Sequence, residues 1–269
     1  MIALYILGGI AGLCALLCLV YLLLLVRPVR KKHVDARLLC NYAHRGLHGD
    51  GVPENSLAAF ERACEAGYGI ELDVQLSSDG EVMVFHDATL VRMTGCDQKL
   101  CELTAKELKD LSLAESDQRI PTFREVLALV NGRVPLLVEL KGESYDTSLC
   151  EKVAPLLAAY QGPYCIESFN PLLVRNIQKL LPDAFCGLLY TNVCREKKKA
   201  SALNLALSIM ALNILARPQF IAYNKKDRTS LPVKLTTGLY RVPAFVWTTR
   251  PKDEDALRDC PAHRIFEKQ

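Results

Sequence analysis

The sequence has 269 residues, half of them apolar, with 33 Lys or Arg against 30 Asp or Glu, 15 Gly and 13 Pro. This composition is too hydrophobic for a disordered chain, and the glycine and proline counts exclude a collagen-like one. Residues 27–37 hold five of the bases and one acid, so the remainder has 28 bases against 29 acids and is nearly neutral. A nucleic-acid-binding domain normally carries a basic footprint over its folded part. We therefore expect no nucleic-acid partner.

Residues 2–26 are predicted to form a single transmembrane helix. These 25 residues carry no charge, and all except three glycines are apolar. At about 1.5 Å per residue the helix would be roughly 37 Å long, enough to cross a hydrocarbon core of about 30 Å. A cleaved secretory signal is the alternative, but such a signal normally begins with basic residues and has a shorter apolar core.

The charges beside this helix predict its orientation. The flanking bases all lie on its carboxyl-terminal side: Arg27, Arg30, Lys31 and Lys32. Because cytoplasmic flanks carry an excess of Lys and Arg, we expect a single-pass protein of the cell membrane with the rest of the chain in the cytoplasm. Residues 27–40 are then a basic juxtamembrane linker, and residues 41–269 form one domain. The 11 scattered cysteines, without metal-like spacing, suit a reducing compartment.

Residues 41–269 alternate short apolar runs with helical periodicity, which is the pattern of βα units around a parallel sheet. The predicted strands are 41–45, 69–75, 82–86, 135–140, 164–168, 185–190, 220–223 and 243–248. The predicted helices are 56–66, 104–111, 122–131, 147–160, 171–181, 195–216 and 252–259. An open doubly wound sheet is the alternative, but the glycine motifs of nucleotide-binding sheets are absent from the sequence. We therefore predict an α/β fold, a TIM (β/α)8 barrel preceded by the transmembrane helix, with an irregular insertion at 88–121.

Acidic side chains lie at the ends of two predicted strands. Glu71 and Asp73 share one face of strand 69–75, because side chains alternate along a strand. Two carboxylates on one face of a buried strand repel each other unless a cation lies between them; solvated acids at a frayed strand end are the alternative. Glu139 lies at the end of strand 135–140. The three carboxylates would form an all-oxygen site, which suits Ca²⁺ or Mg²⁺.

Histidines and cationic residues also lie at these strand ends. His44 and His86 follow the first and third predicted strands. Imidazole titrates near neutral pH, so the two are candidates for a general acid and a general base, although a structural role is the alternative for either alone. Arg45 and Lys141 would supply positive charge for a phosphate group. Four consecutive predicted strands thus end in the residue types that phosphoryl chemistry requires.

Five short motifs resemble the glycerophosphodiester phosphodiesterase family, in the family's order and at similar spacings. They are His44-Arg45-Gly46, Pro53-Glu54-Asn55-Ser56, Glu71-Leu72-Asp73-Val74, Val84-Phe85-His86-Asp87 and Glu139-Leu140-Lys141. Glu167-Ser168-Phe169-Asn170 and Val246-Trp247-Thr248 are similar to the family's later strand ends, so the resemblance covers about residues 41–250. Residues 263–269 depart from the family's usual last unit, and we predict no strand there.

The resemblance implies a TIM-barrel enzyme that cleaves glycerophosphodiesters to sn-glycerol 3-phosphate and an alcohol, with one divalent cation, Ca²⁺ or Mg²⁺, and a cyclic phosphate intermediate. It implies these roles: Glu71, Asp73 and Glu139 as metal ligands, and His44 and His86 as the catalytic pair. The expected substrate-binding residues are Arg45 and Lys141 at the phosphate, Glu54 beside the metal ligands and Trp247 as an apolar wall of the pocket.

Two other functions remain open. Tethering to a membrane also fits a related barrel phosphodiesterase that acts on an intact phospholipid or a lysolipid, such as a lysophospholipase D-like or phosphoinositide-cleaving enzyme. A membrane-anchored binding protein without turnover is the second alternative, although every expected catalytic position is filled. Residues 195–216 are predicted to be an apolar outer helix of the barrel; an interfacial helix that touches anionic lipid is the alternative.

Overall fold

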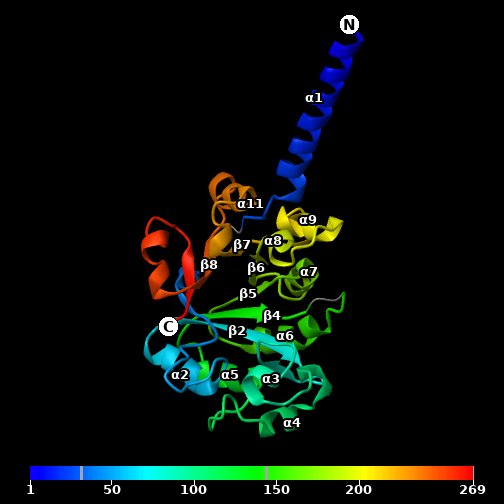
Figure 1. Ribbon diagram of the computed structural model, residues 1–269. Helices are drawn as coiled ribbons and strands as arrows, with labels where there is room; N and C mark the ends of the chain where they lie inside the picture. Colours follow the sequence, from blue (N-terminus) through cyan, green and yellow to red (C-terminus); the bar gives the residue numbers. More distant parts are fainter. Residues whose placement is uncertain (31–32, 143–144, 269) are drawn as a thin grey trace.

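The computed structural model describes residues 1–30, 33–142 and 145–268, and in this part of the chain eight parallel strands close into a barrel (Figure 1). The barrel strands are β1 (Tyr42–Ala43), β2 (Gly69–Leu76), β4 (Leu136–Leu140), β5 (Tyr164–Ser168), β6 (Phe185–Tyr190), β7 (Phe220–Asn224), β8 (Ala244–Thr249) and β9 (His263–Phe266). Each pairs in parallel with its neighbours, and β9 closes the circle against β1. The predicted TIM barrel is confirmed.

Both faces of the strands are buried, which explains their nearly continuous apolar sequences. On β2, Ile70, Leu72 and Val74 point outward and pack under the surrounding helices. The barrel interior is filled by a separate apolar cluster that includes Tyr42, Leu137, Cys165, Phe185, Phe220, Phe245 and Ile265. Glu71 and Asp73 alternate with the outward residues and therefore point into the barrel. The apolar cluster fills the interior of the barrel, and the polar side chains lie at the end where the strands have their carboxyl termini.

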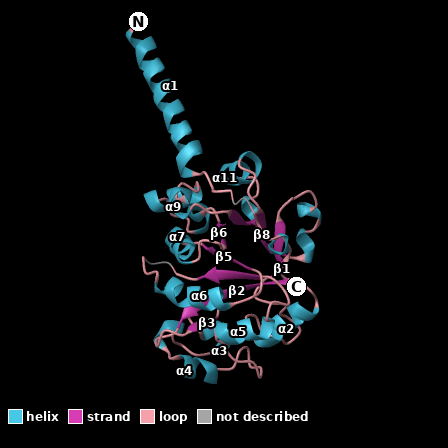
Figure 2. Ribbon diagram, turned by 180° about the vertical axis from the view of Figure 1, so that it is seen from behind, coloured by secondary structure: helices cyan, strands magenta, loops and turns pink. Residues whose placement is uncertain are grey.

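Amphipathic helices cover the outside of the barrel (Figure 2). They include α2 (Leu57–Glu65), α5 (Phe123–Val130), α6 (Ser148–Ala159) and α7 (Pro171–Leu180). Polar caps start three of them: Ser56, Thr122 and Asn170 each accept a backbone N–H from the first turn. The predicted insertion at 88–121 contains α3 (Val91–Thr94) and α4 (Ala105–Asp110), with its own small apolar cluster.

The prediction of 82–86 as a barrel strand is wrong. Strand β3 (Val82–Val84) pairs antiparallel with β2 and lies outside the parallel barrel. The connection of only five residues, 77–81, is too short for a parallel crossover, which needs a dozen or more. The vacant eighth position is taken by β9, in the segment where no strand was predicted.

Two predicted helices are broken in the structure. Residues 195–216 form α8 (Val193–Glu196), α9 (Ala202–Ser208) and α10 (Asn213–Ala216). Ser201 caps α9, and Met210 adopts a positive φ of 54°, so one continuous helix cannot form. Residues 252–259 form two 3-10 turns, Pro251–Asp253 and Asp255–Leu257. A further short helix, α11 (Leu231–Lys234), follows β7.

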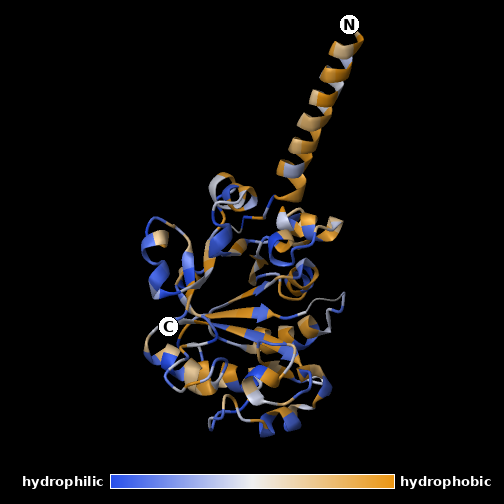
Figure 3. Cartoon of the chain, in the orientation of Figure 1, coloured by the Kyte–Doolittle hydropathy of each residue, from blue (hydrophilic) through white to orange (hydrophobic). Residues whose placement is uncertain are grey.

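Helix α1 (Ile2–Val20) projects from the barrel and is apolar along its length (Figure 3). With its last turns it forms a segment, Ile2–Leu25, that is long and apolar enough to cross a membrane, with a mean hydropathy of 2.5 and none of it buried. A signal sequence has the same length and composition. The segment ends against the barrel, where the Asn213 side chain donates a hydrogen bond of 2.8 Å to the Val26 carbonyl. Lys31 and Lys32 of the predicted linker lie outside the described residues.

Replacement of Ile265 by alanine tests closure of the barrel by β9. The Ile265 side chain is fully buried in the interior cluster, so its truncation leaves a cavity and is expected to lower the free energy of unfolding by about 2–5 kcal/mol. Chemical denaturation measures this loss. Val91→Ala, at an exposed apolar position, is the matched control and should change the free energy by less than about 0.5 kcal/mol. Equal small effects would show that β9 does not contribute to the core.

Candidate active site

A narrow cavity of about 100 Å³ opens at the carboxyl ends of the barrel strands. Its lining residues come from nearly every strand: His44, Arg45, Glu71, His86, Glu139, Lys141, Glu167, Phe169, Leu189, Trp247, Thr248 and Ile265. Seven of the nine predicted site residues are among them. Asp73 is fully buried between these groups, and Glu54 lies behind Arg45. Although β3 is not a barrel strand, the loop that follows it still brings His86 to the cavity.

Three buried carboxylates meet at the base of this cavity. Glu71, Asp73 and Glu139 each offer an oxygen within 4.8 Å of the others. Asp73 and Glu139 are direct register partners on β2 and β4, which explains their proximity. Burial, reinforced by repulsion from Asp73, raises the pKa of Glu71 well above its usual range, and burial raises the pKa of Glu139 to about 7. Ionisation of all three carboxyl groups is therefore disfavoured without a bound cation.

Lys141 and Arg45 are the cationic groups at the cluster. The Lys141 ammonium lies 2.9 Å from Asp73 and 2.7 Å from Glu139. Burial alone would raise the pKa of Asp73, but the nearby Lys141 holds it well below its usual range. Arg45 has a positive φ of 55°, and in this conformation its backbone N–H donates a hydrogen bond of 2.8 Å to Glu71. The Arg45 guanidinium reaches toward Asp73, with 3.6 Å between the nearest atoms, and is held from behind by Glu54 at 2.8 Å.

Two polar residues of the site were not predicted as functional. Asn55 is buried with a positive φ of 53°, and its side-chain amide donates a 2.8 Å hydrogen bond to Asp73. Glu167 is a fourth buried carboxyl group, one of whose oxygens has no hydrogen-bond partner among the described residues. Burial raises its pKa well above the usual range, which favours the protonated form. Both lie within the quoted motifs, but only the fold brings their side chains to the cluster.

Each cavity histidine is oriented by a carboxylate through its Nδ1 atom. His44 lies 2.8 Å from Glu267, which Arg250 holds in turn at 2.6 Å. His86 lies 2.6 Å from Asp87, which is paired with Arg92 at 2.5 Å. Both imidazoles therefore present Nε2 to the cavity. Glu267 directly follows β9, the strand that the sequence did not predict, so its partnership with His44 could not be foreseen.

The apolar side of the cavity is formed by two aromatic rings. Trp247 on β8 donates its indole N–H to the Ala222 carbonyl at 3.0 Å, which fixes the ring. Phe169, after β5, packs against it edge to face with ring centroids 5.6 Å apart. The predicted apolar wall therefore includes Phe169 together with Trp247.

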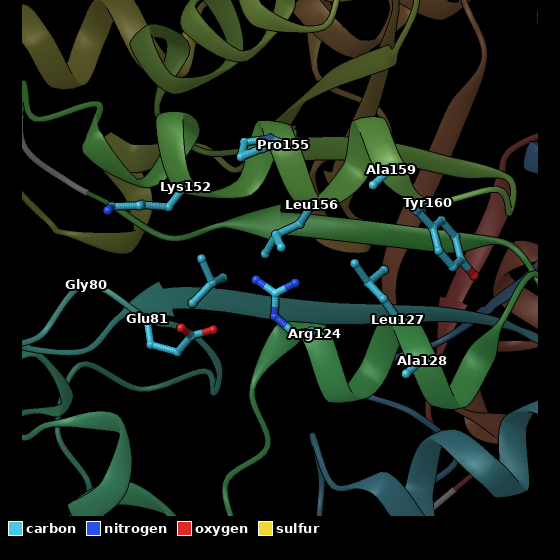
Figure 4. Close-up of a pocket in the computed structure, with 11 residues that line it drawn as sticks. Gly80, Glu81, Arg124, Leu127, Ala128, Lys152, Pro155, Leu156, Ala159 and Tyr160 are labelled. Atoms are coloured by element: carbon cyan, nitrogen blue, oxygen red, sulfur yellow. The ribbon is translucent and has the colours of Figure 1, made fainter.

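A larger groove, of about 610 Å³, lies on the outside of the barrel between α5 and α6 (Figure 4). Arg124 and Lys152 project into it from the two helices, and Glu81 lies at its edge. The carboxylate cluster and both histidines lie at the smaller cavity and not at this groove. Chemistry therefore points to the cavity at the strand ends, in spite of its smaller volume.

Comparison with known proteins shows the family of this chain. Residues 44–218 match the Glycerophosphoryl diester phosphodiesterase family. The chain belongs to this family. A glycerophosphodiester phosphodiesterase of Caldanaerobacter subterraneus is 38% identical over 159 residues, which cover 55% of this chain and 65% of that protein. This match spans slightly less than two thirds of the relative's length.

Solved structures share this fold. A glycerophosphodiester phosphodiesterase from Thermotoga maritima is 27% identical, with a TM-score of 0.66 over 87% of this chain and 95% of that one. A phosphodiesterase from Oleispira antarctica, solved in complex with its product sn-glycerol-3-phosphate, is 22% identical, with a TM-score of 0.70 over 86% and 94% of the two chains.

Proposed function

We propose that this protein is a metal-dependent phosphodiesterase that hydrolyses glycerophosphodiesters to sn-glycerol 3-phosphate and an alcohol. The observation that carries the proposal is the meeting of three buried carboxylates with two carboxylate-oriented histidines in one cavity. Family membership and the product complex of the Oleispira antarctica relative support the substrate class. The apolar wall and the cationic residues give the cavity two sides, one for phosphate and one for the carbon skeleton.

The carboxylate cluster fits a hard divalent cation, Ca²⁺ or Mg²⁺. Its donors are all oxygen atoms, and burial together with repulsion between the carboxylates raises the pKa values of Glu71 and Glu139, a cost that a bound cation would offset. A cation bound by Glu71, Asp73 and Glu139 would act as a Lewis acid toward the phosphate oxygens. Asn55 and Lys141 would orient Asp73 beside it.

His44 and His86 are proposed as the acid and base pair. Burial lowers the pKa of each, so in the free protein both imidazoles are neutral at pH 7. One accepts the proton of the glycerol hydroxyl next to the phosphoester, and this oxygen attacks phosphorus. The other donates a proton to the departing alcohol, after the anionic diester has raised its pKa. Water then opens the cyclic phosphate, with the two roles exchanged. The Arg45 guanidinium donates hydrogen bonds to the phosphate oxygens.

A substrate panel tests the proposal. Purified full-length protein with Ca²⁺ or Mg²⁺ is incubated with glycerophosphocholine, glycerophosphoethanolamine, glycerophosphoinositol and lysophosphatidylcholine, and the products are separated and identified. Release of sn-glycerol 3-phosphate from the first three substrates supports it. Faster turnover of lysophosphatidylcholine would favour the lysolipid alternative, and no turnover of any substrate would favour a binding protein.

Glu267→Gln tests whether this residue positions His44. Burial lowers the pKa of His44, and the Glu267 carboxylate opposes that effect, so its neutralisation should lower the pKa of His44 further. The limb of the pH–rate profile that reports the titration of His44 is therefore expected to move to lower pH. We also expect kcat to fall about tenfold, which is less than the ~10²-fold loss expected when the acid or base itself is removed. Glu254→Gln, at an exposed glutamate in the segment before β9, is the matched control. An unshifted profile in Glu267→Gln would limit Glu267 to a structural role.

We further propose that residues 2–26 anchor the enzyme as a single transmembrane helix, with residues 41–269 as one catalytic domain in the cytoplasm. The length and hydropathy of Ile2–Leu25 support the span, and the flanking bases support the orientation. Protease protection of sealed membrane vesicles tests the orientation. Digestion of the barrel only after the cytoplasmic face is made accessible would support it.

A further inference from the structure

We infer that one side of the barrel, formed by α9, α11 and the turn after α11, rests on an anionic lipid bilayer beside the span. We call this surface the lipid-facing side and define it by four exposed leucines: Leu203, Leu205, Leu231 and Leu239. The inference rests on the proposed membrane anchor. It adds a second, peripheral contact that fixes how the barrel lies on the membrane.

The first observation is where the span ends. The Tyr240 hydroxyl donates a hydrogen bond to the Leu22 carbonyl, and the Tyr21 hydroxyl donates one of 2.9 Å to the Ile209 carbonyl. The candidate span ends at Leu25, so these bonds lie at the level where hydrocarbon gives way to headgroups. Val26 is fully buried in the same contact, within an apolar cluster that also includes Val233 of α11. The segments next to α9 and α11 are therefore held at the membrane interface.

The second observation is the set of apolar side chains exposed there. Figure 1 and Figure 2 both place α9 and α11 around the base of α1, at the end of the barrel nearest the span. Leu203 and Leu205 of α9 are 59% and 55% exposed, and Leu231 of α11 and Leu239 of the turn after it are 63% and 59% exposed. Exposed leucines are costly in water, whereas they gain free energy in the acyl boundary of a bilayer.

The third observation is the distribution of charge. Residues 192–241 contain ten Lys or Arg and only two Asp or Glu. One of these acids, Asp227, is buried and bonded to Arg195. Lys197, Lys198, Lys199 and Lys234 are exposed on this stretch. Outside it and the segment 27–37, the chain has 18 bases against 27 acids. The basic residues are thus concentrated where the barrel meets the span.

Together these features match an anionic bilayer better than a protein partner. Lys and Arg side chains are attracted to an anionic leaflet, and the exposed leucines supply apolar contact with the acyl boundary. In Figure 1 strands β2 and β4 run crosswise to α1, so the barrel lies on its side beneath the span. The active-site cavity then opens along the membrane surface, not away from it.

Added tryptophans measure this contact in the full-length chain. Leu203→Trp and Leu239→Trp variants are reconstituted in vesicles of zwitterionic and anionic phospholipid with brominated acyl chains, which quench tryptophan at short range. Val91→Trp, at an apolar position 49% exposed on α3 in the distant insertion, is the matched control. The wild type, with Trp247 alone, gives the background. We expect quenching at 203 and 239 to exceed that at 91 by about twofold or more.

Neutralising the basic cluster should weaken the contact at α9. Adding Lys197→Gln, Lys198→Gln and Lys199→Gln to Leu203→Trp is expected to reduce its quenching, as is omission of the anionic lipid. Quenching at 203 and 239 no greater than at 91 overturns the inference, as does a chain that fails to co-float with the vesicles. Hydrolysis of soluble glycerophosphocholine by the same variants is expected to equal that of the wild type, so loss of the lipid contact and loss of the proposed activity are distinguished.

Discussion

Alanine at His44 or at His86 is expected to lower kcat for glycerophosphocholine by at least about 10²-fold, the usual scale of general acid–base catalysis. Each imidazole faces the cavity and is oriented by its own carboxylate, so neither can replace the other. Initial rates of choline release at saturating substrate measure the effect. The KM is expected to change little, because the lost groups move protons and do not hold the phosphate.

His33→Ala is the matched control for both variants. This histidine is exposed and lies between the span and the barrel, so its loss should leave kcat unchanged. Circular dichroism and thermal unfolding establish that the variants are folded. Near-normal turnover in either His44→Ala or His86→Ala would remove that residue from the mechanism.

Glu71→Gln is expected to abolish measurable activity while stabilising the metal-free protein. Burial raises the pKa of Glu71 well above that in the unfolded chain, so at neutral pH this carboxyl group destabilises the folded, metal-free protein; the cost shrinks as the pH falls below the folded pKa and is gone below the unfolded pKa. Glutamine resembles the protonated form at every pH. With chelator present, we expect a melting temperature at least about 2–4 °C above wild type, which corresponds to about 1 kcal/mol.

Addition of Ca²⁺ or Mg²⁺ should reverse the order of the two melting temperatures, so that the wild type melts above Glu71→Gln. Wild-type protein at a cation concentration of about 100 Kd gains roughly 2.7 kcal/mol from binding, whereas Glu71→Gln, with one ligand oxygen fewer and no charge at that position, should gain much less. Calorimetric titration of each protein with the cation measures the binding directly. Glu65→Gln, at an exposed position on α2, is the control. Equal cation binding by Glu71→Gln and wild type would exclude Glu71 as a ligand.

The parts of the fold that depend on local patterns were predictable from the sequence. Alternating residues on β2 correctly placed Glu71 and Asp73 on one face, and apolar runs located seven of the eight barrel strands. The hairpin strand β3 was mistaken for a barrel strand because its sequence is equally apolar; only the five-residue connection distinguishes it. Strand β9 contains His263 and Arg264, so its apolar signal is weak, and its pairing with β1 comes from opposite ends of the chain.

The chemistry of the site was predictable to the extent that it follows strand ends. All nine predicted site residues lie in or directly behind the cavity, because carboxyl ends of parallel strands converge. The residues that orient these side chains were harder to predict from the sequence. Glu267 contacts His44 although the two are 223 residues apart in the sequence. Asn55 contacts Asp73 in a backbone conformation with a positive φ, which the sequence does not predict. The break of 195–216 into three helices likewise involves a positive φ, at Met210, between α9 and α10.

The most direct measurement is ³¹P NMR of glycerophosphocholine incubated with the purified full-length protein, first after exhaustive chelation and then after Ca²⁺ or Mg²⁺ is restored. The carboxylate cluster and the two histidines predict that the diester signal persists with chelator, and that it is replaced by the sn-glycerol 3-phosphate signal once the cation is added. Conversion at the same rate in both samples, or no conversion in either, would contradict a metal-dependent glycerophosphodiesterase.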